Sequence, residues 1–297
     1  MPSEIRVNVP EFWDQGYLLI RDVFSTAEVE DFRRHVVENR QWKGKYDLLH
    51  HPHLRKALLD DRVLSIAAQI LGDTPVYYGD SNFTIGQQSF DFHKDNADRG
   101  DSNAPDWKGR YTQIRFGLYL QDHAWHSGGL RLIPRSQNAV SNPMGKRVNV
   151  RSRVGDLIVW NLRTDHTGAA MMLRFLPWIY AEQKQTSRWN SRHLVRLNTR
   201  FPMIVPRFLL ADNGPERAAI FFTLGREDAH LERYLSYMKT RTYAVENWKN
   251  CEYGPDVWDA VQGKNIKVID IGEEIRRRLA EGDTSLGVNK YYAAIPY

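Results

Sequence analysis

Cysteine is almost absent from this sequence, since Cys251 is the only one among 297 residues. A single cysteine forms no internal disulfide and no thiolate cluster, which suits a reducing compartment and excludes zinc sites built from cysteine. Any metal site must therefore use histidine and carboxylate side chains.

Long apolar runs are also lacking. No stretch reaches the ~18 to 20 apolar residues that a membrane-spanning helix needs. The first 17 residues contain no basic segment followed by an apolar one, so we expect no secretory signal and a cytoplasmic protein.

Blocks of one charge sign are missing as well. The net charge is +5 and the isoelectric point is near 9.2, but the basic residues are scattered and no zinc-finger, RNP-type or helix-turn-helix signature is present. We therefore expect no nucleic-acid partner; a small anionic or amphiphilic substrate fits the modest positive charge better. The oligomeric state stays open.

The hydrophobic content of 42% supports a full core, and we expect one domain over residues 1–297. The N-terminal region predicts a strand at 17–20 and then a helix, in which Ser25 and Glu28 have the spacing of a capping box. Residues 54–71 predict one further helix that ends at Gly72.

From Val76 onward the sequence consists of short runs rich in β-branched and aromatic residues, separated by Gly, Pro, Asn and Asp. This pattern of short runs is typical of a sandwich or barrel of short strands, and the flanking helices favour a jelly roll with an outer layer of helices. The runs are VYYG, NFTIG, QIRFGLYLQ, GLRLIP, DLIVWN and AAIFFTLG.

The candidate metal ligands are His93, Asp95 and His166. His93 and Asp95 lie two residues apart in DFHKD, and alternate residues of a strand point to the same face. His166 follows the buried strand DLIVWN and a polar turn. Two histidines and one carboxylate on one face form the facial triad of non-haem Fe(II) oxygenases, although an HxD triplet alone is also common on plain surfaces.

These segments, in their order, resemble the phytanoyl-CoA dioxygenase family. The matching pieces are FWDQGYLLIRDVFSTAEVEDFR, FHKD, SGGLRLIPRSQ, VGDLIVWNLRTDHTG and ERAAIFFTLG, which cover roughly residues 10–168 and 213–225. The resemblance implies a double-stranded β-helix, the cupin-like jelly roll, that binds Fe(II), uses 2-oxoglutarate as co-substrate and consumes dioxygen.

The resemblance also implies an arginine for the far carboxylate of 2-oxoglutarate, at the start of the strand after the second histidine. A buried carboxylate needs such a partner, and arginine can meet it with two parallel hydrogen bonds. Arg217 precedes the run AAIFF but lies 51 residues after His166, which requires residues 169–213 to be an inserted loop. Arg174 is the competing candidate.

Two polar residues and one histidine cluster are further candidates for binding roles. Asn82 and Gln113 are polar residues on predicted strands and could contact the co-substrate. The cluster HHPH at 50–53 could bind a metal, although a solvated loop is the simpler interpretation.

The carboxylate of Asp95 favours hydroxylation of an unactivated C–H bond over halogenation, because the related halogenases replace that carboxylate so that chloride can bind. Desaturation, epoxidation and cyclisation by the same scaffold stay open. Two further interpretations also stay open: a jelly-roll binding protein without catalysis, and a zinc-dependent hydrolase.

Residues 169–213 do not continue the pattern of short predicted strands. They carry seven basic and two acidic residues, a surplus of five, next to the apolar run MMLRFLPWIY. We interpret them as a lid over the metal site that contacts an anionic or amphiphilic substrate, or that rests on an anionic membrane surface presenting a lipid-linked substrate. The alternative is that this segment packs against the rest of the domain or forms a contact between subunits. The role of residues 226–297 stays open.

Overall fold

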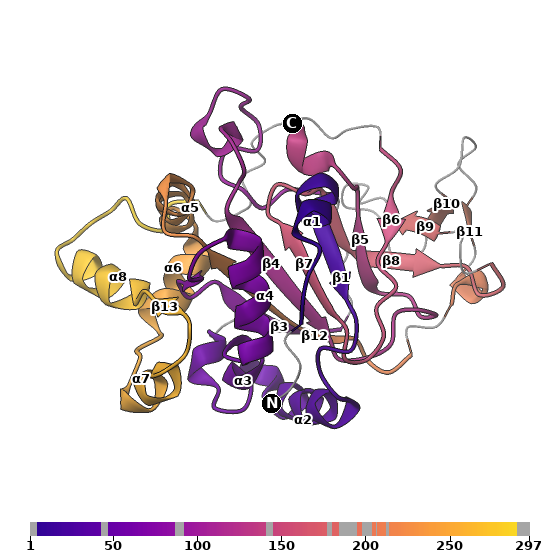
Figure 1. Cartoon of the computed structure of the whole chain (residues 1–297), viewed down its shortest axis with the longest axis horizontal. Helices are drawn as coiled ribbons and strands as arrows, with labels where there is room; N and C mark the ends of the chain where they lie inside the picture. Colours follow the sequence, from indigo (N-terminus) through magenta and orange to yellow (C-terminus); the bar gives the residue numbers. More distant parts are fainter. Residues whose placement is uncertain are drawn as a thin grey trace.

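A computed structural model gives the fold of the chain (Figure 1). The structure describes residues 5–42, 47–86, 92–140, 145–176, 180–183, 195–197, 204–205, 207–211 and 214–289. Strands form the centre of the molecule, and helices cover one side of it.

The N-terminal elements follow the sequence expectation. Helix α1 (Val9–Gln15) leads into strand β1 (Tyr17–Ile20), and helix α2 (Thr26–Glu38) comes next. The hydroxyl of Ser25 accepts from the backbone N–H of Glu28, and the Glu28 carboxylate accepts from the backbone N–H of Ser25. The predicted capping box is therefore confirmed.

The helix expected over 54–71 is two helices, so that prediction was wrong in one respect. Helix α3 (Arg55–Leu58) ends before Asp60, and helix α4 (Asp61–Leu71) begins after it. The Asp60 carboxylate accepts from the backbone N–H of Arg62, which makes Asp60 an N-cap and starts a new helix. The end at Gly72 is confirmed, because Gly72 adopts the left-handed conformation with φ of 70°.

The central strands form two sheets. One has the order β1-β7-β4-β12-β2-β13, with β3 also paired to β12, and the other has the order β11-β10-β9-β8-β5-β6. Besides β1, the strands in these sheets are β2 (Val76–Tyr77), β3 (Ser81–Ile85), β4 (Gln113–Tyr119), β5 (Gly129–Leu132), β6 (Val148–Asn149), β7 (Leu157–Asn161), β8 (His166–Met172), β9 (Tyr180–Gln183), β10 (Val195–Leu197), β11 (Ile204–Val205), β12 (Ala218–Gly225) and β13 (Lys267–Val268).

The chain moves between the two sheets as it proceeds. Strand β3 lies in the first sheet, His93 pairs with the second, β4 returns to the first, and β5 and β6 lie in the second. Strand β7 is again in the first sheet, β8 in the second and β12 in the first. This connectivity is a jelly roll, as the sequence predicted.

Two apolar clusters hold this arrangement. Alternate residues of β4 point outward, where Ile114, Phe116 and Leu118 pack in the large core with residues of α2 and α4. The inward face contributes Tyr119 to a second cluster with Trp160 and other residues of both sheets. The helices therefore back the first sheet, and the second cluster packs between the two sheets.

Residues 169–213 lie largely outside the described residues, but parts of them extend the second sheet. Residues up to Met172 continue β8, and three short strands follow, so the described parts do not form the plain loop that we expected. These strands are β9 (Tyr180–Gln183), β10 (Val195–Leu197) and β11 (Ile204–Val205). An antiparallel bridge between Leu173 and Leu210 joins the two ends of the excursion.

The C-terminal region is mainly helical and lies beside the first sheet (Figure 1). Leu231, Trp248 and Ile275 pack there against Val76 and Tyr78. Its elements are α5 (Ala229–Lys239), α6 (Thr242–Lys249), α7 (Pro255–Val261), β13 (Lys267–Val268) and α8 (Ile271–Ala280). Within the ranges that the structure describes, every helix is too short or too polar to cross a membrane.

Candidate metal centre and anion pocket

The structure brings the three predicted ligands together. His93 and His166 face each other across the two segments, and each donates its backbone N–H to the other's carbonyl oxygen, at 3.1 and 3.0 Å. The backbone N–H of Asp95 donates to the carbonyl oxygen of Leu162 at 2.9 Å. These backbone hydrogen bonds hold residues 93–95 alongside the segment that leads into β8.

The side-chain atoms of this triad have metal-binding spacing. Nε2 of His93 lies 3.5 Å from Oδ1 of Asp95, and Nε2 of His166 lies 3.4 Å from Oδ2. Ligands at ~2.0–2.2 Å from one ion lie ~3.0–3.4 Å from each other, so small inward movements complete the site. The His93 side chain is 29% exposed, against 7% for His166, which leaves one face open.

Asp95 carries the observation that favours a cation. Its Oδ1 is buried and has no hydrogen-bond partner among the described residues. A buried carboxylate oxygen without a partner is costly, and an ion between the three side chains would remove that cost. The donor set of two imidazoles and one carboxylate suits iron and similar transition metals.

The protonation states fit metal binding too. Burial raises the pKa of Asp95, but the attraction of His166 and Arg115 outweighs burial and lowers this pKa to about 2. Burial lowers the pKa of His166 to about 4, although Asp95 opposes that change. At neutral pH the site therefore presents a carboxylate and a neutral imidazole, the forms that coordinate a metal.

Lys94 lies between the two ligands in sequence and points the other way. Its ammonium group is fully buried, pairs with Asp165 at 2.9 Å, and donates to the carbonyl oxygens of Ser136 and Arg163. Asp165 precedes His166. This ion pair thus joins the two ligand-bearing segments on the side away from the metal.

Arg115 on β4 supports the carboxylate ligand. Nη1 donates to Oδ2 of Asp95 at 3.1 Å, and Nη2 donates to Oδ1 of Asp80 at 2.9 Å. Asp80 also accepts from the hydroxyls of Thr223 and Tyr234. Asp95 is therefore oriented by an arginine that is itself held in place.

Arg217 forms a second part of the site. It is 3% exposed, Nε donates to the carbonyl oxygen of Gly128 at 2.8 Å, and Nη1 donates to Oγ1 of Thr84 at 3.0 Å. The guanidinium group lies 5.3 Å from the ring centre of Tyr119. In the described part of the chain it has no carboxylate partner, so it can bind an anion.

Gly168 lies between the triad and Arg217. It comes two residues after His166 on β8, within the register shift between β8 and β5. A Cβ atom at this position would lie 3.4 Å from Nη2 of Arg217, an ordinary contact distance, so β8 approaches the guanidinium group closely here. Two residues of a strand span ~7 Å, so a short dicarboxylate could contact both the metal and the arginine.

The other predicted site residues are placed differently. Asn82 lies on the same face of β3 as Thr84, and its Oδ1 is buried without a partner among the described residues. Gln113 lies at the opposite end of β4 from Tyr119 and accepts from the Tyr78 hydroxyl, so it is not brought to Arg217. The Arg174 side chain is exposed, in contrast to Arg217.

Several residues of the site were missed from the sequence. Arg115 and Tyr119 share the inward face of β4, and their even spacing was the available signal. His123 packs near Arg217 and Tyr119, and burial together with the Arg217 charge lowers its pKa to about 4. A neutral imidazole there leaves Arg217 as the charged group of the pocket.

No family model matches the chain and no curated protein matches it, so the resemblance to the phytanoyl-CoA dioxygenase family stays a prediction. Three similar solved structures illustrate the structure comparison. EvdMO1 is 14% identical with a TM-score of 0.49, and the match covers 74% of this chain but 49% of that one.

The second, EctD from S. alaskensis with bound Fe, is 15% identical with a TM-score of 0.48, covering 75% of this chain and 80% of that one. The third is HygX from Streptomyces hygroscopicus with nickel and 2-oxoglutarate bound. It is 16% identical with a TM-score of 0.48, covering 73% of this chain and 85% of that one. Because these sequence identities and TM-scores are low, the activity of this chain has to be inferred from the site itself.

Proposed function

We propose that this chain is an Fe(II)- and 2-oxoglutarate-dependent oxygenase of the phytanoyl-CoA dioxygenase type, which hydroxylates an unactivated C–H bond of a small or carrier-linked, anionic metabolite. One observation carries the proposal. The triad of His93, Asp95 and His166 lies beside a buried arginine that has no carboxylate partner in the described part of the chain.

The roles of the residues follow from their positions. His93, Asp95 and His166 would hold the iron on one face and leave the opposite positions open. Arg217 would bind the far carboxylate of 2-oxoglutarate, while Thr84 and the carbonyl oxygen of Gly128 fix the guanidinium group. When bound, the iron supplies dioxygen activation coupled to oxidative decarboxylation of the co-substrate.

Burial of the site contributes to the chemistry. Trp160 is 1% exposed and its ring lies 5.4 Å from that of His166, so it would exclude water from one side of an ion held by the triad. Arg115 holds the Asp95 carboxylate at a fixed angle. The carboxylate ligand leaves no place for chloride, which favours hydroxylation over halogenation.

A hydrolytic zinc site accounts for the triad but not for Arg217. A zinc-bound water does not itself require a buried cation beside the metal, and burial of a guanidinium group without an anionic partner is costly. A binding protein that has lost catalysis would likewise have no need to keep both features. The pairing of triad and arginine therefore favours the oxygenase.

The test is an anaerobic titration of the purified protein with Fe(II) and then 2-oxoglutarate, followed by visible absorption. We expect one equivalent of iron and a weak metal-to-ligand charge-transfer band that requires both additions. His166→Ala should lose iron binding, whereas Arg217→Ala should keep iron and need far more 2-oxoglutarate. A wild-type protein that binds iron without the band would overturn the proposal.

The substrate class needs a separate measurement. Succinate formation should be followed with a chemically mixed panel of acyl thioesters, amino acids, sugars and phosphonates. Stimulation by one class, together with a hydroxylated product, would define the reaction. A product that is desaturated, epoxidised or cyclised would correct the proposed outcome without affecting the assignment of the site.

A further inference from the structure

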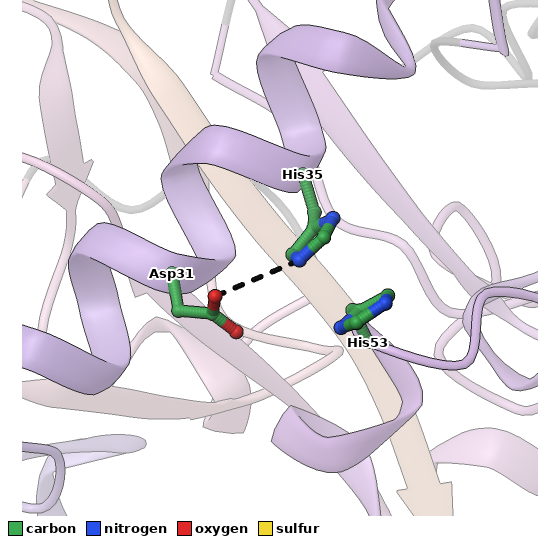
Figure 2. Close-up of side chains that lie close together, drawn as sticks. All are labelled: Asp31, His35 and His53. Atoms are coloured by element: carbon green, nitrogen blue, oxygen red, sulfur yellow. Dashed lines mark ion pairs between the residues drawn. The ribbon is translucent and has the colours of Figure 1, made fainter.

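A second group of possible metal ligands lies on the outer surface, away from the jelly-roll interior. Figure 2 shows Asp31 and His35 on helix α2, with the ring of His53 facing them from another segment. One ligand atom from each of the three lies within 4.8 Å of the other two. Of the described residues, only these and the triad form such a group.

The helix places two of the ligands. Asp31 and His35 are four residues apart on α2, so their side chains lie on the same face. Nε2 of His35 is 3.6 Å from Oδ1 of Asp31. His53 belongs to the turn before α3, and its neighbours His50 and His51 face Tyr253 and Phe83 instead.

The two imidazole rings lie almost parallel. Their centres are 3.6 Å apart and their planes differ by 14°. Two nitrogens bound to one zinc-type ion at ~2.0–2.1 Å lie ~3.3 Å apart. The lone pairs of parallel rings do not converge on one point, so the exposed His53 ring would have to turn toward His35 and Asp31 to bind the same ion. A pair of protonated rings would repel each other at the same distance.

The surroundings of His35 point to a cation. Its Nε2 is sealed from solvent and has no hydrogen-bond partner within the described ranges. Its Nδ1 lies 3.3 Å from Oε2 of Glu38, on the other side of the ring. A carboxylate near one nitrogen favours the tautomer with the proton on that nitrogen, which leaves the lone pair of the other nitrogen for a metal.

We propose that Asp31, His35 and His53 form a second site for a divalent transition-metal ion of the zinc type. Two imidazoles and a carboxylate suit such an ion, and solvent would complete its coordination. The ion would join α2 to the turn before α3. Helix α2 also contacts the segment just before β12 that carries Arg217, since Arg33 donates to the carbonyl oxygen of Glu216 at 2.6 Å.

The experiment removes the triad first, so that its outcome does not depend on the proposed oxygenase activity. In the full-length His93→Ala/His166→Ala variant, Zn²⁺ binding at neutral pH should be measured by equilibrium dialysis and by the change in Tm. We expect one equivalent of zinc and a rise in Tm. Absence of binding in this background would overturn the second site while leaving the oxygenase proposal intact.

Two further substitutions in that background locate the ion. His53→Gln should weaken zinc binding at least ~10-fold, because loss of a supporting group alone costs that much. His53 is exposed, so its replacement should leave the fold unchanged. His126→Gln, at another surface histidine with 38% of its side chain exposed, is the matched control and should bind like its parent. Equal zinc affinity in the His53 and His126 variants would also overturn the proposal.

Discussion

Arg115 reaches the carboxylate of Asp95 with one end of its guanidinium group and the carboxylate of Asp80 with the other. The two contacts measure 3.1 Å and 2.9 Å, and the Arg115 side chain is 16% exposed. The candidate metal ligand Asp95 is thus positioned by a residue that lies 20 positions away in sequence, on strand β4 of the first sheet.

Arg115→Lys should therefore weaken iron binding. Lysine keeps the charge, but a single ammonium group cannot bridge the two carboxylates with the same geometry. We expect Fe(II) affinity to fall ~10- to 100-fold, as for other outer-shell changes around a metal. Anaerobic titration would measure the change, with Arg277→Lys at an exposed helical position as the control. Unchanged Fe(II) affinity would mean that the Arg115 guanidinium group is not needed to orient the Asp95 carboxylate.

Arg217→Ala should raise the apparent requirement for 2-oxoglutarate. The far carboxylate would lose a charged partner that makes two hydrogen bonds, and each is worth ~1.5–3 kcal/mol, so the increase should be at least ~100-fold. Arg174→Ala should have little effect, because the Arg174 side chain is exposed. Succinate formation at varied 2-oxoglutarate concentration measures both. A larger effect of Arg174→Ala than of Arg217→Ala would mean that the co-substrate does not bind at Arg217.

The metal-free protein should lose stability as the pH falls from about 6.5 to about 4. Burial and the Arg217 charge lower the pKa of His123 from 6.5 to about 4. The unfolded chain therefore takes up a proton near pH 6.5, while the folded protein does so only near pH 4. Each such histidine reduces the free energy of unfolding by at most ~3–4 kcal/mol.

Urea unfolding with a chelator present, at pH 7 and pH 4.5, checks this expectation. His123→Gln should lose less stability over that interval than the unchanged protein, because glutamine does not titrate. Part of the loss should remain, since the pKa of His166 is also lowered to about 4, chiefly by burial. The same loss in both proteins would show that His123 is not the responsible group.

The excursion within residues 169–213 can be tested without disturbing its base. Its two ends are joined by the hydrogen bond from the Arg174 backbone N–H to the carbonyl oxygen of Leu209, at 2.8 Å. Residues 175–208 can therefore be replaced by an Asn-Gly turn that closes the same hairpin. Phe175 and Phe208 would be removed with it; they are 75% and 72% exposed.

If the excursion is a lid, the shortened protein should bind iron and 2-oxoglutarate normally and decarboxylate the co-substrate without hydroxylating substrate. Both reactions can be measured with the substrate found in the panel. Full hydroxylation by the shortened protein would contradict the lid. Loss of iron binding as well would mean that the excursion is part of the fold.

The pattern of residues along the chain was sufficient for the local elements and for the triad candidates. The capping pair Ser25 and Glu28, the runs of β-branched and aromatic residues, and the two-residue spacing of His93 and Asp95 act over a few residues. The backbone period and capping chemistry are the same in any fold, so such features can be predicted from sequence. The one helix that was misjudged broke at Asp60, a cap within an otherwise continuous apolar pattern.

Contacts across the sheets could be decided only by the tertiary structure. The bridge of Arg115 between Asp95 and Asp80, the pocket around Arg217, and the stacking of His53 on His35 join residues that are remote in sequence. Which strands pair, and which helix face meets which turn, depends on the packing of the whole chain. Sequence spacing therefore supplied the metal ligands, whereas packing supplied the groups that hold them and the partners of the second site.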